Sequence, residues 1–522
     1  MLLRRVFVGM AIGAAAFGAV YVSQAVKAGA AKTQKPDLKP FYTQKLNWTP
    51  CEDKMQCAWL TVPRSYTTKN THGTFRIRVI KDPATGTRAQ FQGALIMNPG
   101  GPGGSGVKFI AHKTIDDARL HKAYDFVSFD PRGVGDSEPK IDCGLTNAQL
   151  DAINFTEAAP RTAQQRTALI RAYGAIGKDC AANDADVVKY VDTVSVARDI
   201  DVLRAALNES KVTWMGFSYG TKLGATYAEL FPKRVRRMVL DGVVPTNTTY
   251  FDEGVEHART EELGIKHYLE TCPNRTFSDC PFSADPGQGE AKLVALLNSL
   301  RAHPVQVTTG RGTGFVDDGY LSQVIDEDGT GSVGDYPDLD ALLAPAITKG
   351  DLGPIYNEVQ DGDGRNPDDT YPDHGEHDAI FFSIKCIDSP TDESVKRFAA
   401  AAAAARKINP LTGEASVWSV ATCLHWPYRT TMPEARFHND GQPPILLIGS
   451  NHDFTTPLSW AESMAKQIKH SSLIRTDNYQ HTSFAFGDPC VVDSTDTYLL
   501  TGKTPGKDVA CFGMSKTPEP VH

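Results

Sequence analysis

The sequence predicts an α/β fold with a mostly parallel central sheet. Short apolar runs alternate along the chain with stretches of helical periodicity. Ala94–Met97 is a continuous apolar run of the kind found in strands that are buried on both faces. Between residues 196 and 207 the apolar positions recur every three or four residues, which is typical of an amphipathic helix. Because strands and helices alternate, we expect parallel strands joined by right-handed crossovers.

The expected elements follow this rhythm over most of the chain. We expect strands at 75–80, 94–97, 126–129, 212–215, 238–240, 445–448 and 472–474. We expect helices near 107–112, 196–207, 219–230, 253–269, 393–406 and 458–468. The rhythm stops after about residue 245 and returns with the strand at 445–448.

The interruption at 246–440 contains helical stretches and acidic loops rich in glycine and proline. The last two predicted strands need an existing sheet to pair with, so we favour one sheet domain with an inserted, mainly helical cap over two sequential domains. A chain of 522 residues is also too long for one compact core. The predicted division is a signal peptide (1–30), a pro-segment or linker (31–50), a core in two parts (51–245 and 441–522) and the cap (246–440).

The composition excludes several classes of function. Hydrophobic residues make up 41% and charged residues 22% of the chain, as in soluble globular proteins. The net charge of −8 leaves no basic excess to neutralise phosphates, so we expect no nucleic-acid partner. Two polar clusters, at 361–364 and 374–378, lack the context of a known metal site, and we interpret both as solvated loops. We therefore expect neither a metal nor a cofactor.

The first thirty residues have the order of an export signal. Arginines at positions 4 and 5 precede an uncharged run over 6–26, and Ala-Gly-Ala at 28–30 offers a cleavage site. The paired arginines also fit a twin-arginine signal, so the export route stays open. The run is weakly hydrophobic, which favours cleavage over a retained anchor. We expect a secreted or cell-envelope protein, monomeric, with membrane contact only through an uncleaved signal.

The cysteines agree with export, because disulfides form in oxidising compartments. There are ten of them, and they fall into five neighbouring couples along the chain. Sequential pairing is the simplest arrangement, although other connectivities stay open. The disulfide candidates are Cys51, Cys57, Cys143, Cys180, Cys272, Cys280, Cys386, Cys423, Cys490 and Cys511.

Gly216–Gly220 matches the Gly-x-Ser-x-Gly nucleophile elbow and places Ser218 at its centre. The motif alone is weak, but here a predicted strand ends just before it and a predicted helix follows at once. This context is the strand-turn-helix of the α/β-hydrolase fold, in which the serine lies at a helix N-terminus. We therefore predict Ser218 as the nucleophile.

A serine hydroxyl needs a base, and in this fold the acid and then the histidine follow the serine in the chain. The strand at 445–448 leads to Asp453, and the strand at 472–474 leads to His481. His452 precedes the acid, and Asp477 follows the strand that delivers the histidine, so both are weaker candidates. The predicted triad is Ser218, Asp453 and His481.

The negative oxygen of a tetrahedral intermediate needs backbone donors. One should be the N–H of Tyr219, directly after the nucleophile, and the other should come from the glycine-rich loop after the strand at 94–97. We predict Gly101 as the second donor, with Gly100 as the alternate. The same loop also satisfies Gly-x-Gly-x-x-Gly, with Asp125 about twenty residues on, so a dinucleotide-binding oxidoreductase is an alternative. That alternative leaves the predicted triad unexplained.

Taken together, these motifs resemble the secreted tripeptidyl aminopeptidases of actinobacteria, which are relatives of the prolyl aminopeptidases. The matching segments are Asn98–Gly106, Phe129–Ser137, Arg198–Asp201, Gly216–Gly220, Leu240–Val243, Ile384–Asp388, Asp453–Pro457 and His481. The resemblance spans about residues 48–511 and places the family's triad on Ser218, Asp453 and His481. Gln480 departs from the glycine that many relatives have before the histidine.

The resemblance implies removal of short peptides, tripeptides in this family, from free amino termini under a cap that closes over the triad. Relatives in the broader group bind the substrate ammonium with cap carboxylates. The predicted helix 253–269 offers Glu253, Glu256, Glu261 and Glu262, although for each of them a solvated acidic face is the alternative. Fold and triad do not select the acyl substrate, so a carboxylesterase or lipid hydrolase is the main alternative function. The third candidate function is that of a cell-surface binding protein with a vestigial catalytic site.

Overall fold

The computed structural model describes residues 37–67, 73–275, 280–282, 285–330, 333–373, 375–389, 391, 393–430 and 441–512. The predicted signal peptide lies outside these residues. Within them, no helix is long and apolar enough to cross a membrane. Residues from 37 onward, predicted as a pro-segment or linker, pack against the folded body: α1 (Lys39–Tyr42) brings the Tyr42 hydroxyl to 2.7 Å from a carboxylate oxygen of Asp201.

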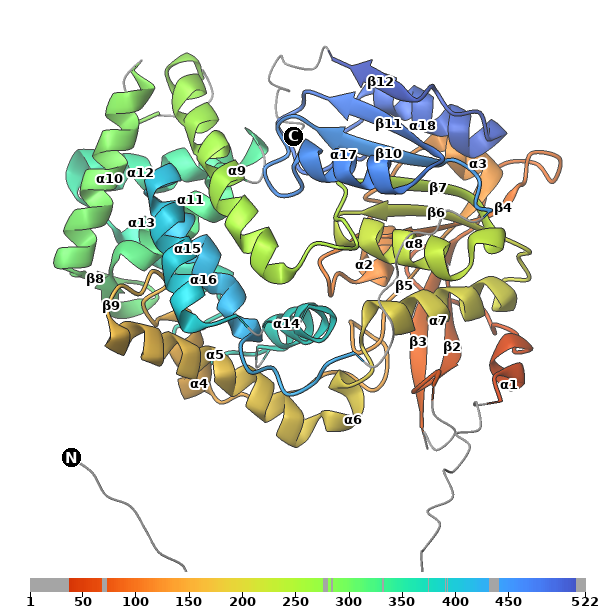
Figure 1. Ribbon diagram of the computed structural model, residues 1–522, viewed down its shortest axis with the longest axis horizontal. Coiled ribbons are helices and arrows are strands. Elements are labelled where there is room, and N and C mark those ends of the chain that lie inside the picture. The colour runs from red at the N-terminus through yellow and green to blue at the C-terminus, as the bar shows by residue number, and fades with distance from the viewer. Residues whose placement is uncertain are drawn as a thin grey trace, which may run out of the picture.

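A ten-stranded sheet forms the centre of the molecule, with the order β1-β2-β3-β5-β4-β6-β7-β10-β11-β12 (Figure 1). The pairs β1–β2, β2–β3 and β3–β5 are antiparallel. All the pairs from β5 across the sheet to β12 are parallel. The strands are Thr49–Pro50 (β1), Gln56–Pro63 (β2), Thr74–Asp82 (β3), Gly93–Asn98 (β4), Tyr124–Phe129 (β5), Val212–Phe217 (β6), Val235–Asp241 (β7), Ile445–Ser450 (β10), Ser471–Thr476 (β11) and Asp508–Cys511 (β12). The predicted mostly parallel sheet is confirmed.

Strands β7 and β10 are neighbours in this sheet, although the chain between them builds a separate helical layer. Leu447 of β10 pairs with Leu240 of β7, and β11 then pairs with β10. The last strands therefore complete a sheet that the first half of the chain began.

Helices cover both faces of the sheet and enclose two hydrophobic cores. Core residues on one side come from α7 (Thr193–Ala206), α8 (Tyr219–Leu230) and α17 (Leu458–Gln467). Core residues on the other side come from α2 (Gly106–Ala111), α3 (Ala118–Ala123) and α18 (Pro489–Thr501). The strands between them are buried on both faces, as their continuous apolar runs predict.

The segment between β7 and β10, called the cap segment below, lies to the left of the sheet in Figure 1 and is mainly helical. Part of it encloses a third hydrophobic core. Its elements are α9 (Tyr250–Thr271), α10 (Pro286–Ala302), β8 (Val305–Thr309), β9 (Gly312–Val316), α11 (Asp318–Thr330), α12 (Tyr336–Lys349), α13 (Gly353–Gly362), α14 (Glu376–Asp388), α15 (Val395–Ile408), α16 (Gly413–Ser419) and the 3₁₀ turn η4 (Val420–Cys423).

A second helical segment, α4 (Asn147–Asn154), α5 (Ala163–Asn183) and α6 (Ala185–Val188), leaves the sheet between β5 and α7. The sequence prediction included these residues in the core, but in Figure 1 α4 and α5 run below the cap segment. Arg161, just before α5, forms a 2.5 Å ion pair with Glu414 of α16, and the Tyr371 hydroxyl bonds Asp151 of α4 at 2.9 Å. Two separate stretches of chain thus build the helical layer.

Candidate active site

Ser218 occupies a strained turn between β6 and α8. Its backbone has φ 54° and ψ −127°, a conformation that L-residues rarely adopt and that proteins keep mainly at functional sites. Glycine is required on both sides: a Cβ on Gly216 would lie 2.3 Å from the Gly220 carbonyl oxygen, and one on Gly220 would lie 2.6 Å from the Asn98 carbonyl oxygen. Gly216–Gly220 therefore forms a tight strand-to-helix turn with the backbone geometry expected of a nucleophile elbow.

Asp453 and His481 face each other at the carboxyl ends of β10 and β11. The imidazole Nδ1 lies 3.1 Å from both carboxylate oxygens, and the Asp453 side chain is 1% exposed. Asp453 also accepts hydrogen bonds from the Thr456 N–H (2.8 Å), the Thr456 hydroxyl (2.6 Å) and the Thr482 N–H (3.1 Å). These donors hold the carboxylate in place, so it can orient the imidazole.

The two groups change each other's protonation. Burial alone would raise the pKa of Asp453, but the charge of His481 and the hydrogen bonds from His481 and Thr456 lower it below its usual value. Burial would likewise lower the pKa of His481, but the charge and hydrogen bond of Asp453 raise it. The pair is thus built to stabilise an imidazolium beside a carboxylate.

The end of β7 joins the nucleophile to the histidine loop. The Asp241 carbonyl accepts the Ser218 N–H at 2.9 Å, and its carboxylate accepts two backbone N–H groups of the loop after His481, at 3.0 and 2.8 Å. At the next residue, Gly242, a Cβ would lie 3.4 Å from His481 Cε1. Among the described residues the Ser218 hydroxyl makes no hydrogen bond to the imidazole, and such contacts commonly tighten only when substrate binds.

The glycine-rich loop after β4 lies against the elbow. A Cβ on Gly100, which has φ +101°, would lie 2.9 Å from the Ser218 Cβ. The Gly100 N–H is already used, because it donates to Asn98 Oδ1 at 3.1 Å. No acceptor for the Gly101 N–H is found among the described residues, and the Tyr219 N–H is the first of α8 and has no acceptor within the helix. This arrangement favours Gly101 over Gly100.

The rival residues occupy other positions. The His452 ring stacks on Tyr479 with 3.8 Å between ring centroids, and Tyr479 stacks in turn on His267 of α9 at 3.5 Å. Of the cluster at 374–378, His374 lies outside the described residues, while the His377 side chain is 80% exposed. Within the part of the chain that the structure describes, no group of three or more His, Cys, Asp and Glu side chains could hold a metal ion.

The four α9 glutamates that the sequence analysis named differ in their partners. Three form ion pairs: Glu253 with Lys385, Glu256 with Arg259, and Glu262 with Lys266. Glu261, which is buried, instead accepts hydrogen bonds from the hydroxyls of Thr412 (2.7 Å) and Ser416 (2.5 Å). Their neighbours therefore single out Glu261 as the one that lies beside a polar cavity.

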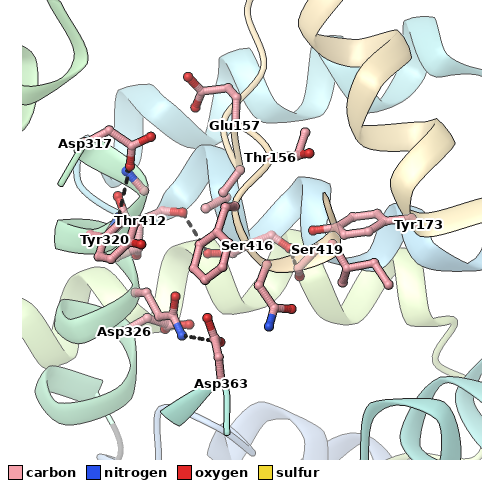
Figure 2. Close-up of a pocket in the computed structure, with 18 residues that line it drawn as sticks. Thr156, Glu157, Tyr173, Asp317, Tyr320, Asp326, Asp363, Thr412, Ser416 and Ser419 are labelled. Carbon is pink, nitrogen blue, oxygen red and sulfur yellow. Dashed lines mark hydrogen bonds between the residues drawn. The ribbon is translucent and has the colours of Figure 1, made fainter. Parts of the chain in front are cut away.

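This cavity, of about 240 Å³, is shown in Figure 2. It lies between α5, α11 and α16, and Thr412 and Ser416 belong to its wall. Four carboxyl groups line it as well: Glu157, Asp317, Asp326 and Asp363. Burial raises the pKa of Glu157 to about 7 and that of Asp363 to about 7. The cavity therefore offers an acidic environment in the helical layer, apart from Ser218 and His481.

The disulfides follow the sequential pairing. The bonds are Cys51–Cys57, Cys143–Cys180, Cys272–Cys280, Cys386–Cys423 and Cys490–Cys511. Such a set is characteristic of proteins that mature in an oxidising compartment.

The strand-turn-helix at Ser218 and the sheet that supports it define an α/β-hydrolase. The family model described as "alpha/beta hydrolase fold" matches residues 93–300, and the model described as "TAP-like protein" matches residues 409–511. The chain is 31% identical to the tripeptidyl aminopeptidase of Streptomyces lividans, over 89% of this chain and 85% of that protein. The chain belongs to the tripeptidyl aminopeptidase family and is a serine peptidase.

Two further relatives show the range of names in this group. The serine protease Hip1 of Mycobacterium tuberculosis is 29% identical, over 93% of this chain and 94% of that protein. Carboxylesterase B of the same organism is also 29% identical, over 90% of this chain and 91% of that protein. Peptidase and esterase names therefore both occur among the relatives.

Proposed function

We propose that this protein removes short peptides, tripeptides in particular, from free amino termini, with Ser218, His481 and Asp453 as its catalytic triad. The observation that carries this proposal is the Asp453–His481 pair, held beside the nucleophile elbow through Asp241. The names of the relatives supply the substrate class. The triad supplies an activated hydroxyl, which a peptidase needs.

The chemistry follows from the protonation of the pair. Asp453 occupies Nδ1, so Nε2 of neutral His481 is the nitrogen that removes the proton of Ser218 as its oxygen attacks the peptide carbonyl. The Gly101 and Tyr219 N–H groups stabilise the negative oxygen. The imidazolium then protonates the leaving amine, and water hydrolyses the acyl-enzyme by the reverse proton transfers.

The cap at 246–440 and the segment α4–α6 would close over the bound peptide. We assign the acidic cavity of Figure 2 to the ammonium group of the substrate, because four carboxyl groups line it and burial raises the pKa of two of them, Glu157 and Asp363, to about 7. An ammonium beside these groups would favour their charged forms. Binding would then select peptides with a free amino terminus.

The first prediction is that Ser218→Ala abolishes turnover, with kcat reduced by roughly 10⁴-fold or more, because the variant lacks the oxygen that attacks the carbonyl. Release of chromophore from tripeptide substrates with free and acetylated amino termini measures both the chemistry and the specificity. The native protein should cleave the free substrates and discriminate against the acetylated ones. Peptidase activity retained in Ser218→Ala would contradict the triad.

The second prediction concerns the cavity. Asp326→Asn should lower kcat/KM for free tripeptide substrates by about 10- to 100-fold, since a charge-assisted contact to the ammonium is lost. The acetylated substrate should be affected little. Glu256→Gln is the matched control, because Glu256 pairs with Arg259 on the same helix as Glu261 but is absent from the cavity wall. Equal losses for free and acetylated substrates would refute the assignment of the cavity.

An esterase is the second candidate, and the carboxylesterase B relative favours it. Both enzymes would share the triad, so fluorophosphonate labelling of Ser218 cannot separate them. Comparing kcat/KM for tripeptide anilides and for short acyl esters does separate them. A preference for esters that does not depend on an amino group would support the esterase.

We also propose that the protein is exported. The predicted signal at 1–30 and the five disulfides support this assignment. Fractionation of the native producer into cytoplasm, envelope and medium, combined with sequencing of the mature amino terminus, tests both export and cleavage.

A further inference from the structure

Helix α14 of the cap segment reaches both halves of the proposed oxyanion hole. A Cβ on Gly103, which has φ +99°, would lie 2.8 Å from Ile380 Cγ2, so the helix rests directly on the glycine loop. At the end of the same helix, Asp388 accepts the Thr193 N–H at 2.9 Å. The Thr193 hydroxyl then contacts both Asp388 and the phenol oxygen of Tyr219. The chain of contacts ends on the residue that follows the nucleophile.

The direction of these hydrogen bonds follows from the chemistry of the groups. An ionised carboxylate only accepts, so the Thr193 hydroxyl donates to Asp388 and its oxygen accepts the proton of Tyr219. Burial raises the pKa of Asp388 to about 6, and the charge of Lys222 opposes that rise. Asp388 is therefore ionised at neutral pH. Thr193 and Tyr219 are both buried, where such a network is strong.

The last turn of α14 is fixed by the rest of the cap segment. The disulfide Cys386–Cys423 ties it covalently to η4, and Lys385 forms an ion pair with Glu253 of α9. Asp388 therefore has a defined position within the cap segment. The hydrogen bonds described for Asp388 are to Thr193, and none involves a residue of the proposed triad.

We propose that Asp388 is a positioning residue for the oxyanion hole. Acting through Thr193, it orients Tyr219 so that the N–H after the nucleophile points at the developing negative charge. This role rests on the proposed function, since it requires the Tyr219 N–H to be an oxyanion donor. Asp388 itself touches no reacting atom.

The test uses variants that keep the shape of the network. Thr193→Val removes the hydroxyl, and Asp388→Asn puts an amide donor against Thr193, where it competes with Tyr219. Each variant should lower kcat for a free tripeptide anilide by about tenfold or more, with KM changed less than about twofold, because the contact matters in the transition state. Thr193→Ser, which keeps the hydroxyl, should restore kcat.

A transition-state analogue gives the readout that a merely structural role would not produce. A peptide boronate forms a tetrahedral adduct on Ser218 with an oxygen in the oxyanion hole. Its affinity should fall by the same factor as kcat, while the affinity for the tripeptide product stays unchanged. Tyr219→Phe keeps the ring and the N–H but removes the phenol oxygen, and it should show the same selective loss even if a Thr193 or Asp388 variant fails to fold.

Tyr227→Phe is the matched control on the same helix. The Tyr227 hydroxyl donates to Asp201 at 3.3 Å, so this variant also loses a buried phenol–carboxylate contact, but on an α8 residue with no described contact to the proposed oxyanion hole. It should leave kcat and boronate affinity unchanged.

Two results would overturn the proposal. One is kcat and boronate affinity within about twofold of the native values in both Thr193→Val and Tyr219→Phe. The other is an equal loss of affinity for boronate and product, which would indicate general damage to the site. If Ser218→Ala is inactive while the positioning variants are unaffected, only this inference fails. Activity in Ser218→Ala would instead refute the proposed function.

Discussion

At the scale of single residues, the site depends on how Asp453 is held. It accepts hydrogen bonds from Thr456 and Thr482 as well as from His481, so the carboxylate keeps its charge despite being buried. The same charge raises the pKa of His481. Since the base must be neutral, activity should rise with pH as His481 loses its proton.

The third prediction is that Asp453→Asn lowers kcat by roughly 10⁴-fold, because the amide no longer holds the imidazole tautomer or stabilises the imidazolium. The acid limb of kcat/KM should also move to lower pH, since His481 loses the neighbouring negative charge that raises its pKa. Asp477→Asn, which changes the rival acid, should alter neither quantity by more than about twofold. A pH–rate profile measures both, and an acid limb unmoved in Asp453→Asn would contradict the pairing.

The residues of the proposed triad could be named from the sequence, because chain order and strand ends constrain the choice. The supporting residues could not. Thr456 and Asp241 lie in motifs that the sequence displays, Asp453–Pro457 and Leu240–Val243, but only their contacts reveal that one holds the acid and the other links the nucleophile to the histidine loop. Short polar side chains give no periodic pattern from which such a role could be inferred.

At the scale of the elements, two motifs outside the site meet in one buried ion pair. Arg132, in the loop after β5, bonds Asp199 of α7 through Nε at 2.5 Å and Nη2 at 2.7 Å. The same guanidinium donates to the Pro63 carbonyl at the end of β2, and the Tyr66 hydroxyl donates to Asp199. The pair therefore joins a strand end, a loop and a helix that are far apart in the chain.

The fourth prediction is that Asp199→Ala lowers the free energy of unfolding by about 3–5 kcal/mol, because it leaves a buried, unpaired guanidinium. Denaturant unfolding with the disulfides intact measures the change. Arg76→Ala is the control: Arg76 and Glu138 pair at 2.7 Å, but both side chains are about half exposed, so the loss should be under about 1 kcal/mol. Similar losses in the two variants would refute the structural role of the buried pair.

All the expected strands and helices are present, with ends that differ by a few residues, because apolar periodicity is a local property. Strands β1, β2, β8, β9 and β12 were not predicted. Strands β1, β8, β9 and β12 have few buried positions and so no apolar run. Strand β2 is longer and largely buried, but its residues were not interpreted as a strand. Helices α4–α6 were not assigned to the helical layer, because they are remote in sequence from the cap segment that they pack against.

At the scale of the whole molecule, the disulfides close loops of different length. Cys143–Cys180 and Cys386–Cys423 each close a separation of 37 residues, whereas Cys51–Cys57 closes one of 6. The entropy that a disulfide removes from the unfolded chain grows with this separation. The longer bonds should therefore contribute more to stability.

The fifth prediction is that replacing Cys143 and Cys180 by alanine lowers the free energy of unfolding by about 4 kcal/mol, against about 2 kcal/mol for the same change at Cys51 and Cys57. Both double variants leave the triad untouched, so the remaining folded protein should keep its kcat. Unfolding in guanidinium checks the order of the two effects. A larger loss for the short bond would contradict the entropic account.

The mostly parallel sheet and the proposed order of serine, acid and histidine could be predicted from the sequence, because each depends on local periodicity or on position along the chain. The tertiary structure was needed to find which α9 glutamate lies beside the acidic cavity, which helices form the second layer, and that Asp388 reaches Tyr219 through Thr193. Those contacts join residues far apart in sequence. A side chain's partner at such a distance is set by packing, which no local pattern records.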